Sequence, residues 1–195
     1  MAVKASTIIG GQSGSNDRVP ADYYATPAEV TYALLCTRWA EEYLFSDERA
    51  FTTVWEPAAG TGEMAEAMKD RDLPVVATEL HDRGYGRTGV NFLHCFEAEG
   101  GAIITNPPFS LAVDFIRHAR MFRVPFALLL KATFWNAGTR RKLFEDTGPQ
   151  VIYPLTWRPA MAPDRGKSAT LDFMWTCWGP EPKGSCSFRP LPRRA

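Results

Sequence analysis

The residues whose types and spacing could do chemistry begin with residues 105–109, Thr-Asn-Pro-Pro-Phe. They follow an apolar run and precede a helical pattern. Two successive prolines fix φ at about −65°, supply no N–H and hold the preceding residue out of the helical region. The Asn106 side chain and its neighbouring carbonyls would therefore be held rigidly beside an aromatic ring. This arrangement could clamp a flat molecule that carries an amino group; a rigid turn without chemistry is the alternative.

A second candidate stretch is residues 56–62, Glu-Pro-Ala-Ala-Gly-Thr-Gly, between a β-rich run and a helical segment. Gly60 and Gly62 would let the backbone approach a ligand closely, and a helix N-terminus offers free N–H groups. The spacing is not Gly-x-Gly-x-x-Gly, and no Lys-Ser/Thr follows as in a P-loop. Dinucleotide and nucleoside-triphosphate binding are therefore both disfavoured. A strand that ends in Glu79 follows, and an acid at that position is typical of a ribose ligand; a surface charge is the alternative.

The elements that must position these residues alternate along the chain. Apolar patterns predict a helix over residues 27–44, with Thr26 as its N-cap, and further helices over 65–70, 111–122 and 140–146. Strands are predicted over residues 51–55, 73–79, 90–93, 102–105, 125–131, 151–155 and 171–178. The alternation predicts an α/β fold, a seven-stranded, mostly parallel, Rossmann-like sheet with helices on both faces. The last two strands lack an intervening helix, so they should pair antiparallel at one edge.

Ligands on such sheets bind outside the carboxyl ends of the strands. That edge would gather the two candidate stretches, Glu79, the pair Asn91-Phe92 and residues 131–135. The sequence therefore predicts one site rather than several.

Composition predicts one domain. The chain has 195 residues, 45% hydrophobic and 23% charged, and we expect a flexible leader at 1–20, a domain at 21–179 and a Pro/Arg-rich, extended or disordered tail at 180–195. No apolar run approaches the roughly 18–20 residues of a membrane span, and no signal-peptide core is present. The four cysteines and three histidines lack ligand or C-x-x-C spacing. We expect a cytoplasmic protein without a metal or a disulfide framework.

Charge is distributed unevenly along the chain. Residues 1–130 hold 11 Lys and Arg against 17 Asp and Glu, whereas residues 131–195 hold 11 against 5. A basic C-terminal third predicts a polyanionic partner, with chance segregation as the alternative. The candidate phosphate contacts are Lys131, Arg140, Arg141, Arg158, Arg165 and Lys167.

In motif order, residues 22–178 resemble the S-adenosylmethionine-dependent amino-methyltransferases, in particular small, phage-type DNA adenine-N6 methyltransferases. Residues 22–27 resemble the family's methionine-pocket motif, residues 56–62 its cofactor loop, Glu79 its ribose-binding acid and residues 106–109 its catalytic motif. The resemblance implies a methyltransferase sheet and catalysis by Asn106, Pro107, Pro108 and Phe109. It implies cofactor contacts from Tyr24, Thr26, Pro27, Glu56, Pro57, Ala58, Gly60, Gly62, Glu79, Asn91 and Phe92.

The chain departs from that family in two ways. The family often has Asp-Phe where this chain has Asn91-Phe92; the asparagine oxygen can still accept from an exocyclic amine. Only 43 residues separate Gly62 from Asn106, which leaves no room for a separate target-recognition domain. Recognition must then be minimal, made by residues 156–170 and the tail, or supplied by a partner.

The implied substrate is adenine in DNA, double- or single-stranded, with the base flipped into the pocket. Phe109 would stack on the base, and Phe134 or Trp135 could form the opposite wall; both could equally be core aromatics. The same motif also serves enzymes that methylate RNA adenine or protein glutamine. A cofactor- or DNA-binding subunit without catalysis is a further alternative.

Overall fold

The computed structural model describes residues 24–45, 52–161 and 171–193, so the predicted leader at 1–20 lies outside the described residues. The strands are β1 (Val54–Glu56), β2 (Val75–Glu79), β3 (Arg87–Thr88), β4 (Ala102–Thr105), β5 (Phe126–Lys131), β6 (Val151–Pro154), β7 (Phe173–Trp178) and β8 (Ser187–Phe188). The α-helices are α1 (Ala28–Leu35), α2 (Arg38–Tyr43), α3 (Glu63–Lys69), α4 (Ala112–Met121) and α5 (Arg141–Thr147). Short 3₁₀ helices are η3 (Phe92–His94), η4 (Phe109–Leu111), η5 (Phe134–Asn136) and η6 (Gly138–Arg140).

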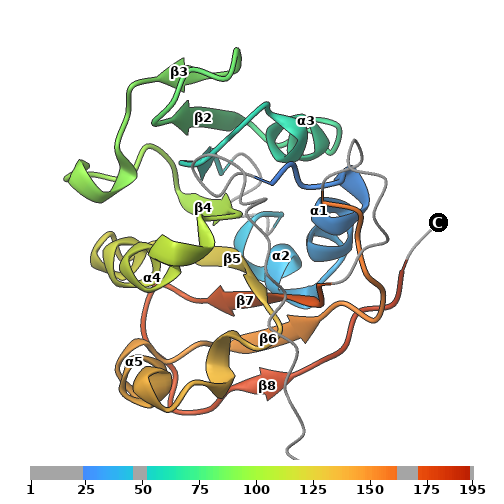
Figure 1. Ribbon diagram of the computed structural model, residues 1–195, viewed down its shortest axis with the longest axis vertical. Coiled ribbons are helices and arrows are strands. Elements are labelled where there is room, and N and C mark those ends of the chain that lie inside the picture. Colours follow the sequence, from blue (N-terminus) through green and yellow to red (C-terminus); the bar gives the residue numbers. More distant parts are fainter. Residues whose placement is uncertain (1–23, 46–51, 162–170, 194–195) are drawn as a thin grey trace, which may run out of the picture.

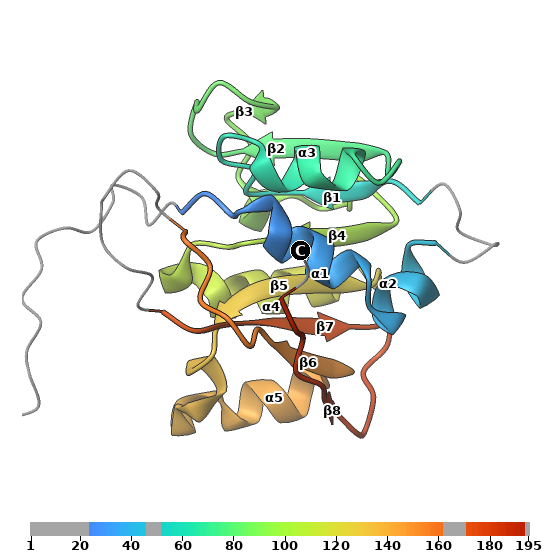
Figure 2. The same ribbon diagram turned by 90° about the vertical axis from the view of Figure 1, so that its right-hand side faces the viewer.

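The strands form a single sheet in the order β3-β2-β1-β4-β5-β7-β6-β8 (Figure 2). The first five in this order are parallel to one another. β7 is antiparallel to both β5 and β6, and β8 is parallel to β6. Only β7 therefore runs against the rest, and the carboxyl ends of β1, β2, β4 and β5 share one edge.

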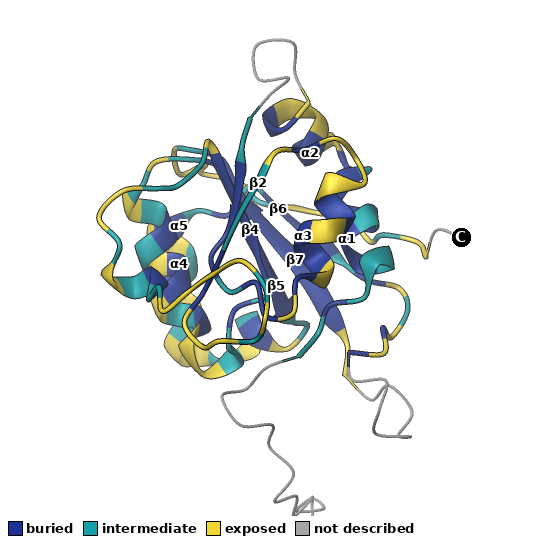
Figure 3. Cartoon of the chain, turned by 90° about the horizontal axis from the view of Figure 1, so that it is seen from above, coloured by how far each residue is buried: buried dark blue, intermediate teal, exposed yellow. Residues whose placement is uncertain are grey.

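Helices cover both faces of the sheet, with α1 to α3 on one side and α4 and α5 on the other (Figures 1 and 3). Neighbouring residues of a strand point to opposite faces. Ile104 thus packs in the core with α1 to α3, and Ile103 packs in the core with α4. On α4, Ala112, Phe115, Ile116 and Ala119 are buried, the spacing of one helix face. The mostly parallel α/β prediction is confirmed.

The sheet has one strand more than the sequence predicts. β8 comes from the tail, which was expected to be extended or disordered, and it pairs with β6. The antiparallel pair of β6 and β7 is confirmed, but it does not form the edge, because β8 covers β6 on its outer side. The strand predicted over residues 90–93 is wrong: the third strand is β3, and Phe92–His94 form η3. Polar residues on either side of so short a segment gave no period by which to place it.

The helix predicted over residues 27–44 is two helices. Thr37 has an extended backbone (φ −96°, ψ 158°), and its Oγ1 accepts a hydrogen bond from the backbone N–H of Ala40, which starts α2. The N-cap prediction for Thr26 is also wrong. The residue before α1 is Pro27, with no side-chain cap, and the Thr26 hydroxyl accepts from the Asn106 side chain instead.

The tail is tied to the domain at several points. Arg120 of α4 donates to the carbonyl oxygens of Gly179, Pro180 and Thr147. Further along, Arg193 donates to the carboxylate of Glu29 on α1. Across the described ranges, no helix is long and apolar enough to cross a membrane.

Candidate active site

An open cavity of about 810 Å³ lies at the carboxyl ends of β1, β2, β4 and β5. The sequence-predicted residues that line it are Tyr24, Thr26, Glu56, Pro57, Ala58, Glu79, Asn91, Phe92, Asn106, Pro108, Phe109 and Lys131. The sheet therefore brings most of the predicted site together. Pro27, Gly60, Gly62 and Pro107 adjoin these residues in the chain but do not line the cavity themselves.

The Asn106 side chain is fixed in one orientation. Its Nδ2 donates to the carbonyl oxygen of Tyr24 at 3.3 Å and to Oγ1 of Thr26 at 3.1 Å. A carbonyl oxygen can only accept, so a flipped amide would set two acceptors against each other. Oδ1 is buried and has no hydrogen-bond partner. Because buried polar groups are nearly always satisfied, this oxygen is an acceptor held ready for a donor.

The Phe109 ring contacts an aromatic residue and a cation. It stacks on Tyr24 with ring centroids 5.2 Å apart and an interplanar angle of 27°. The Lys131 ammonium, at the end of β5, lies 4.2 Å from its centroid. The residues around the Asn106 amide thus offer a flat aromatic surface and one positive charge.

Glu79 is buried, with 7% of its surface exposed. Its Oε2 accepts from the backbone N–H of Gly60 at 2.9 Å, and its Oε1 accepts from the backbone N–H of His81 at 3.1 Å. A carboxylate oxygen can accept more than one hydrogen bond. Both oxygens are therefore held in place and can still accept from ligand hydroxyl groups.

Glu56 ends β1 and is 2% exposed. Its Oε2 has no hydrogen-bond partner. Burial raises the pKa of this carboxyl well above its usual range, the negative charges of Glu63 and Glu79 raise it further, and a hydrogen bond from the backbone N–H of Ala65 lowers it. The cavity thus contains a second unsatisfied polar atom besides Asn106 Oδ1.

Gly62 allows close approach of a neighbouring aromatic ring. Gly62 has φ +95°, and a Cβ there would lie 2.4 Å from the Tyr85 ring. The Tyr85 hydroxyl in turn bonds Glu66 of α3 and accepts from Lys69. In this structure, the missing side chain makes room for Tyr85, and the segment that follows β2 is thereby packed against α3.

Asn91 and Phe92 lie at the side of the cavity. The Oδ1 of Asn91 accepts from the backbone N–H of Leu93 at 3.0 Å, which leaves one lone pair for a ligand. Phe92 is 2% exposed, with its ring 5.2 Å from that of Trp55. Its contribution is to the shape of the wall.

Of the predicted substrate contacts that the structure describes, most lie away from the cavity. Phe134 is buried, with the Arg140 guanidinium 3.9 Å from its ring, and the indole N–H of Trp135 donates to Thr176. Neither lines the cavity, and Arg158 pairs with Asp172 at 2.7 Å. Arg165 and Lys167 lie outside the described residues.

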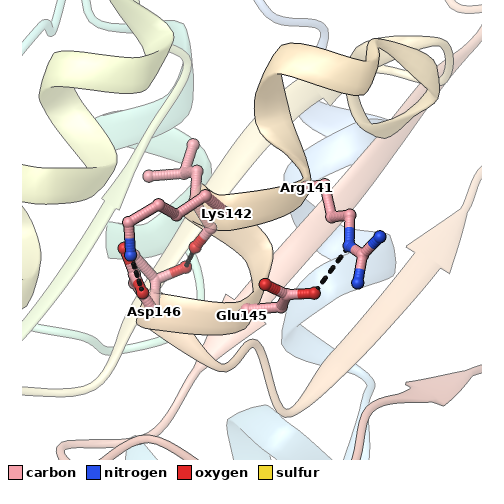
Figure 4. A network of polar contacts seen from close by, with 6 residues as sticks. Arg141, Lys142, Glu145 and Asp146 are labelled. Atoms are coloured by element: carbon pink, nitrogen blue, oxygen red, sulfur yellow. Dashed lines mark hydrogen bonds and ion pairs between the residues drawn. The ribbon is translucent and has the colours of Figure 1, made fainter.

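Arg141 pairs with Glu145 one helical turn away, and Lys142 pairs with Asp146 in the same way (Figure 4). These are exposed i,i+4 pairs on α5. Together with the Arg140 contact, they show how local partners take up several charges of the basic third.

Sequence reasoning missed several residues that line the cavity: Ala25, Ala59, Glu63, Met64, Leu80, His81, Arg83, Val90, Ser110, Leu111 and Phe115. Most are immediate neighbours of a predicted motif. Widening each motif by one or two positions at a strand end would have found them. Arg83 and Phe115 are the exceptions, since Arg83 lies four positions after Glu79 and Phe115 comes from α4. No group of three metal-ligating side chains occurs in the part of the chain that the structure describes.

Comparison with known proteins finds no matching family model and no matching curated protein. Solved structures do match. A candidate class I S-adenosylmethionine-dependent methyltransferase from Listeria monocytogenes has a TM-score of 0.60 at 12% identity, covering 89% of this chain and 67% of its own. A candidate RNA methyltransferase from Pyrococcus horikoshii has a TM-score of 0.59 at 14% identity, covering 82% of this chain and 87% of its own.

A modification subunit of a candidate type I restriction enzyme from Vibrio vulnificus has a TM-score of 0.57 at 14% identity, covering 86% of this chain. This chain spans about half the length of that subunit, 47%. At such identities the likeness shows the fold alone. The chain therefore has the mixed α/β, Rossmann-like fold of class I methyltransferases, with β8 as an added edge strand.

Proposed function

We propose that this chain transfers a methyl group from S-adenosylmethionine to the exocyclic amine of adenine in DNA. The observation that carries the proposal is Oδ1 of Asn106, a buried acceptor without a partner at the cavity wall. Its amide is held by Tyr24 and Thr26, so it cannot turn its nitrogen toward the ligand. A site of this kind selects a donor, and an amine on a flat molecule is such a donor.

The residues around the cavity fit the cofactor. Glu79 offers carboxylate oxygens to ribose hydroxyls, the role such an acid has on this kind of sheet, and Asn91 keeps a lone pair for an exocyclic amine. The unpartnered Glu56 Oε2 favours a ligand that brings positive charge. When bound, S-adenosylmethionine supplies an electrophilic methyl group on a sulfonium.

Asn106 would act on the nucleophile. The amine of adenine is a weak nucleophile because its lone pair is delocalised into the ring. Asn106 Oδ1 would hold one amine proton, and the second acceptor would be the carbonyl oxygen of Pro107, a buried residue that adjoins the cavity without lining it in this structure. Holding both protons would favour a pyramidal nitrogen with a localised lone pair. As positive charge develops on that nitrogen, the same acceptors stabilise it, so their effect is greatest in the transition state.

Phe109 supports a base as the substrate. Stacking of a flipped base on an aromatic ring contributes about 1–3 kcal/mol, which offsets part of the cost of unstacking it. The base would stack on the face of the Phe109 ring near Lys131. The displaced Lys131 ammonium would then be available to bind a phosphate. The basic C-terminal third also favours nucleic acid over protein. The Vibrio neighbour, named as a type I modification subunit, lends support to DNA.

The test is methyl transfer from labelled S-adenosylmethionine to adenine-containing DNA, with RNA and protein offered in parallel. We expect transfer to DNA, its loss in Asn106→Ala, and its retention in Asn136→Ala, a matched substitution at an exposed position that does not line the cavity. Transfer to RNA or protein alone would refute the substrate class. Cofactor binding without any transfer would instead indicate a non-catalytic subunit.

A further inference from the structure

Glu56 lines the cavity. It ends a strand that lies between the strands of Glu79 and Asn106, the two residues that the proposed function places around the reacting centre. In the sheet, β1 lies between β2 and β4. Glu79 ends β2, Glu56 ends β1 and Asn106 directly follows β4. Glu56 is in register with Ala77, two residues before Glu79. Along the strand direction, Glu56 therefore lies farther than Glu79 from the open carboxyl edge of the sheet.

The positively charged sulfur of S-adenosylmethionine would lie near Glu56. This sulfur is bonded to the ribose, which Glu79 would bind, and its methyl must face the amine that Asn106 would hold. The sulfur must therefore lie between Glu79 and Asn106, and Glu56 is the strand-end side chain between them. The unpartnered, buried Oε2 is thus carried by the residue that ends the strand between the two groups flanking the expected charge.

The charged groups around Glu56 do not compensate it. Glu63 at the start of α3 and Glu79 of β2 are the charges that act on its carboxyl, and both are negative. His81 and Arg83, after β2, and Lys131 of β5 line the same cavity, but the donor that hydrogen-bonds Glu56 is the backbone N–H of Ala65. A buried carboxylate without a counterion is unfavourable, so the empty site favours the protonated, neutral form.

We propose that Glu56 responds to the sulfonium charge: it is neutral in the free protein and releases its proton when S-adenosylmethionine binds, so the site favours this cofactor over its neutral product, S-adenosylhomocysteine. This inference rests on the proposed function for the identity of the ligand. The two ligands share the ribose and the amino-acid group, and they differ in net charge by the sulfonium. Glu56 thus determines which of them the site holds more tightly.

The sign of the pH dependence follows from linkage. Below the pKa of Glu56 in the free protein, a proton must leave before the complex with the charged ligand forms. Raising the pH therefore strengthens S-adenosylmethionine binding, by up to about tenfold per pH unit for one proton. The increase ends at the pKa of Glu56 in the free protein, which burial raises well above the usual carboxyl range. Binding of the neutral product has no such increase.

The experiment is isothermal titration calorimetry of the full chain with each ligand, at several pH values and in buffers of different ionisation enthalpy. We expect close to one proton released per S-adenosylmethionine bound at the acid end, and few or none with S-adenosylhomocysteine. Glu56→Gln keeps the shape of the side chain and should remove both the proton release and the pH slope. Glu97→Gln is the matched control, an exposed carboxylate that does not line the cavity, and should keep both.

Equal proton release with the two ligands would overturn the inference, as would an unchanged slope in Glu56→Gln. The comparison of ligands uses the unaltered protein, so it decides the matter even if the variant does not fold. Failure of both ligands to bind would overturn the inference together with the proposed cofactor. Proton release with S-adenosylmethionine, but no transfer to DNA, would support the inference while refuting the proposed function.

Discussion

Replacing Asn106 tests the central geometry of the site. Asn106→Ala removes the acceptor Oδ1 and leaves the carbonyl oxygen of Tyr24 and the hydroxyl of Thr26 without their shared donor. Hydrogen bonds to charged groups contribute about 1.5–3 kcal/mol. If the bond is made to an amine that becomes positive in the transition state, its loss lowers kcat by about 10- to 150-fold.

Asn106→Asp separates orientation from the mere presence of an oxygen. The aspartate has the same shape and keeps an acceptor, but it places an oxygen where Nδ2 lies 3.3 Å from the carbonyl oxygen of Tyr24. Two acceptors at this distance repel each other, so the side chain must turn or take up a proton. We expect a loss of kcat at least as large as in Asn106→Ala, although an oxygen is retained.

Thr26→Val removes one of the two bonds that hold the amide and keeps the size of the side chain. The lost hydrogen bond contributes about 0.5–1.5 kcal/mol, so kcat should fall by about two- to tenfold and remain well above that of Asn106→Ala. The assay is single-turnover methyl transfer to an adenine-containing duplex, with cofactor affinity measured by calorimetry to separate misfolding from lost chemistry. If Asn106→Asp kept more than a third of the normal kcat, the argument that the fixed orientation of the Asn106 amide is required would be refuted.

Three further predictions concern packing and charge. Gly62→Ala should lower the free energy of unfolding by more than Gly84→Ala does, because Gly84 also has positive φ but open space around it. In a double-mutant cycle measured by urea unfolding, Tyr85→Ala should remove this extra destabilisation. Arg120→Met should lower the free energy of unfolding by about 2–4 kcal/mol, because three carbonyl oxygens lose their donor. Arg117→Met, on the exposed side of α4, is the control and should change that free energy by less than about 0.5 kcal/mol. Duplex affinity should fall steeply with salt, with a slope of log K against log salt of about −0.9 per phosphate contacted, and salt-independent binding would contradict the polyanion argument.

The sequence predicted those parts of the site that local chemistry determines. A strand ending in Asn-Pro-Pro-Phe, a glycine-containing turn and an acid at a strand end are each readable from a few neighbouring residues, and the parallel sheet then brings them to one edge. What the sequence could not show is the contact that orients Asn106. Thr26 and Tyr24 precede it by 80 and 82 positions, and Thr26 followed by Pro27 resembles an ordinary helix start.

The same limit applies to the elements. Helix and strand were predicted where apolar periodicity is long, as in α4 and β5. The break between α1 and α2 lies at Thr37, whose hydroxyl donates to the carbonyl oxygen of Leu34 and accepts from the backbone N–H of Ala40, although the helical pattern continues on both sides. β8 has two residues and depends on pairing with β6 rather than on its own pattern.

The charge of the C-terminal third shows why counting residues is a weak guide to a binding surface. The excess of cations over residues 131–195 predicted a patch of phosphate contacts. In the structure, Arg141 and Lys142 pair within α5, Arg158 pairs with Asp172, and Arg193 pairs with Glu29 of the acidic part of the chain. Among the described cations of that third, Lys131 alone lines the cavity. Arg83, in the acidic part of the chain, lines the cavity as well. At about −0.9 per phosphate, a salt slope steeper than about −1.8 would therefore require phosphate contacts from beyond the cavity wall, and its magnitude reports how far the nucleic acid extends over the protein.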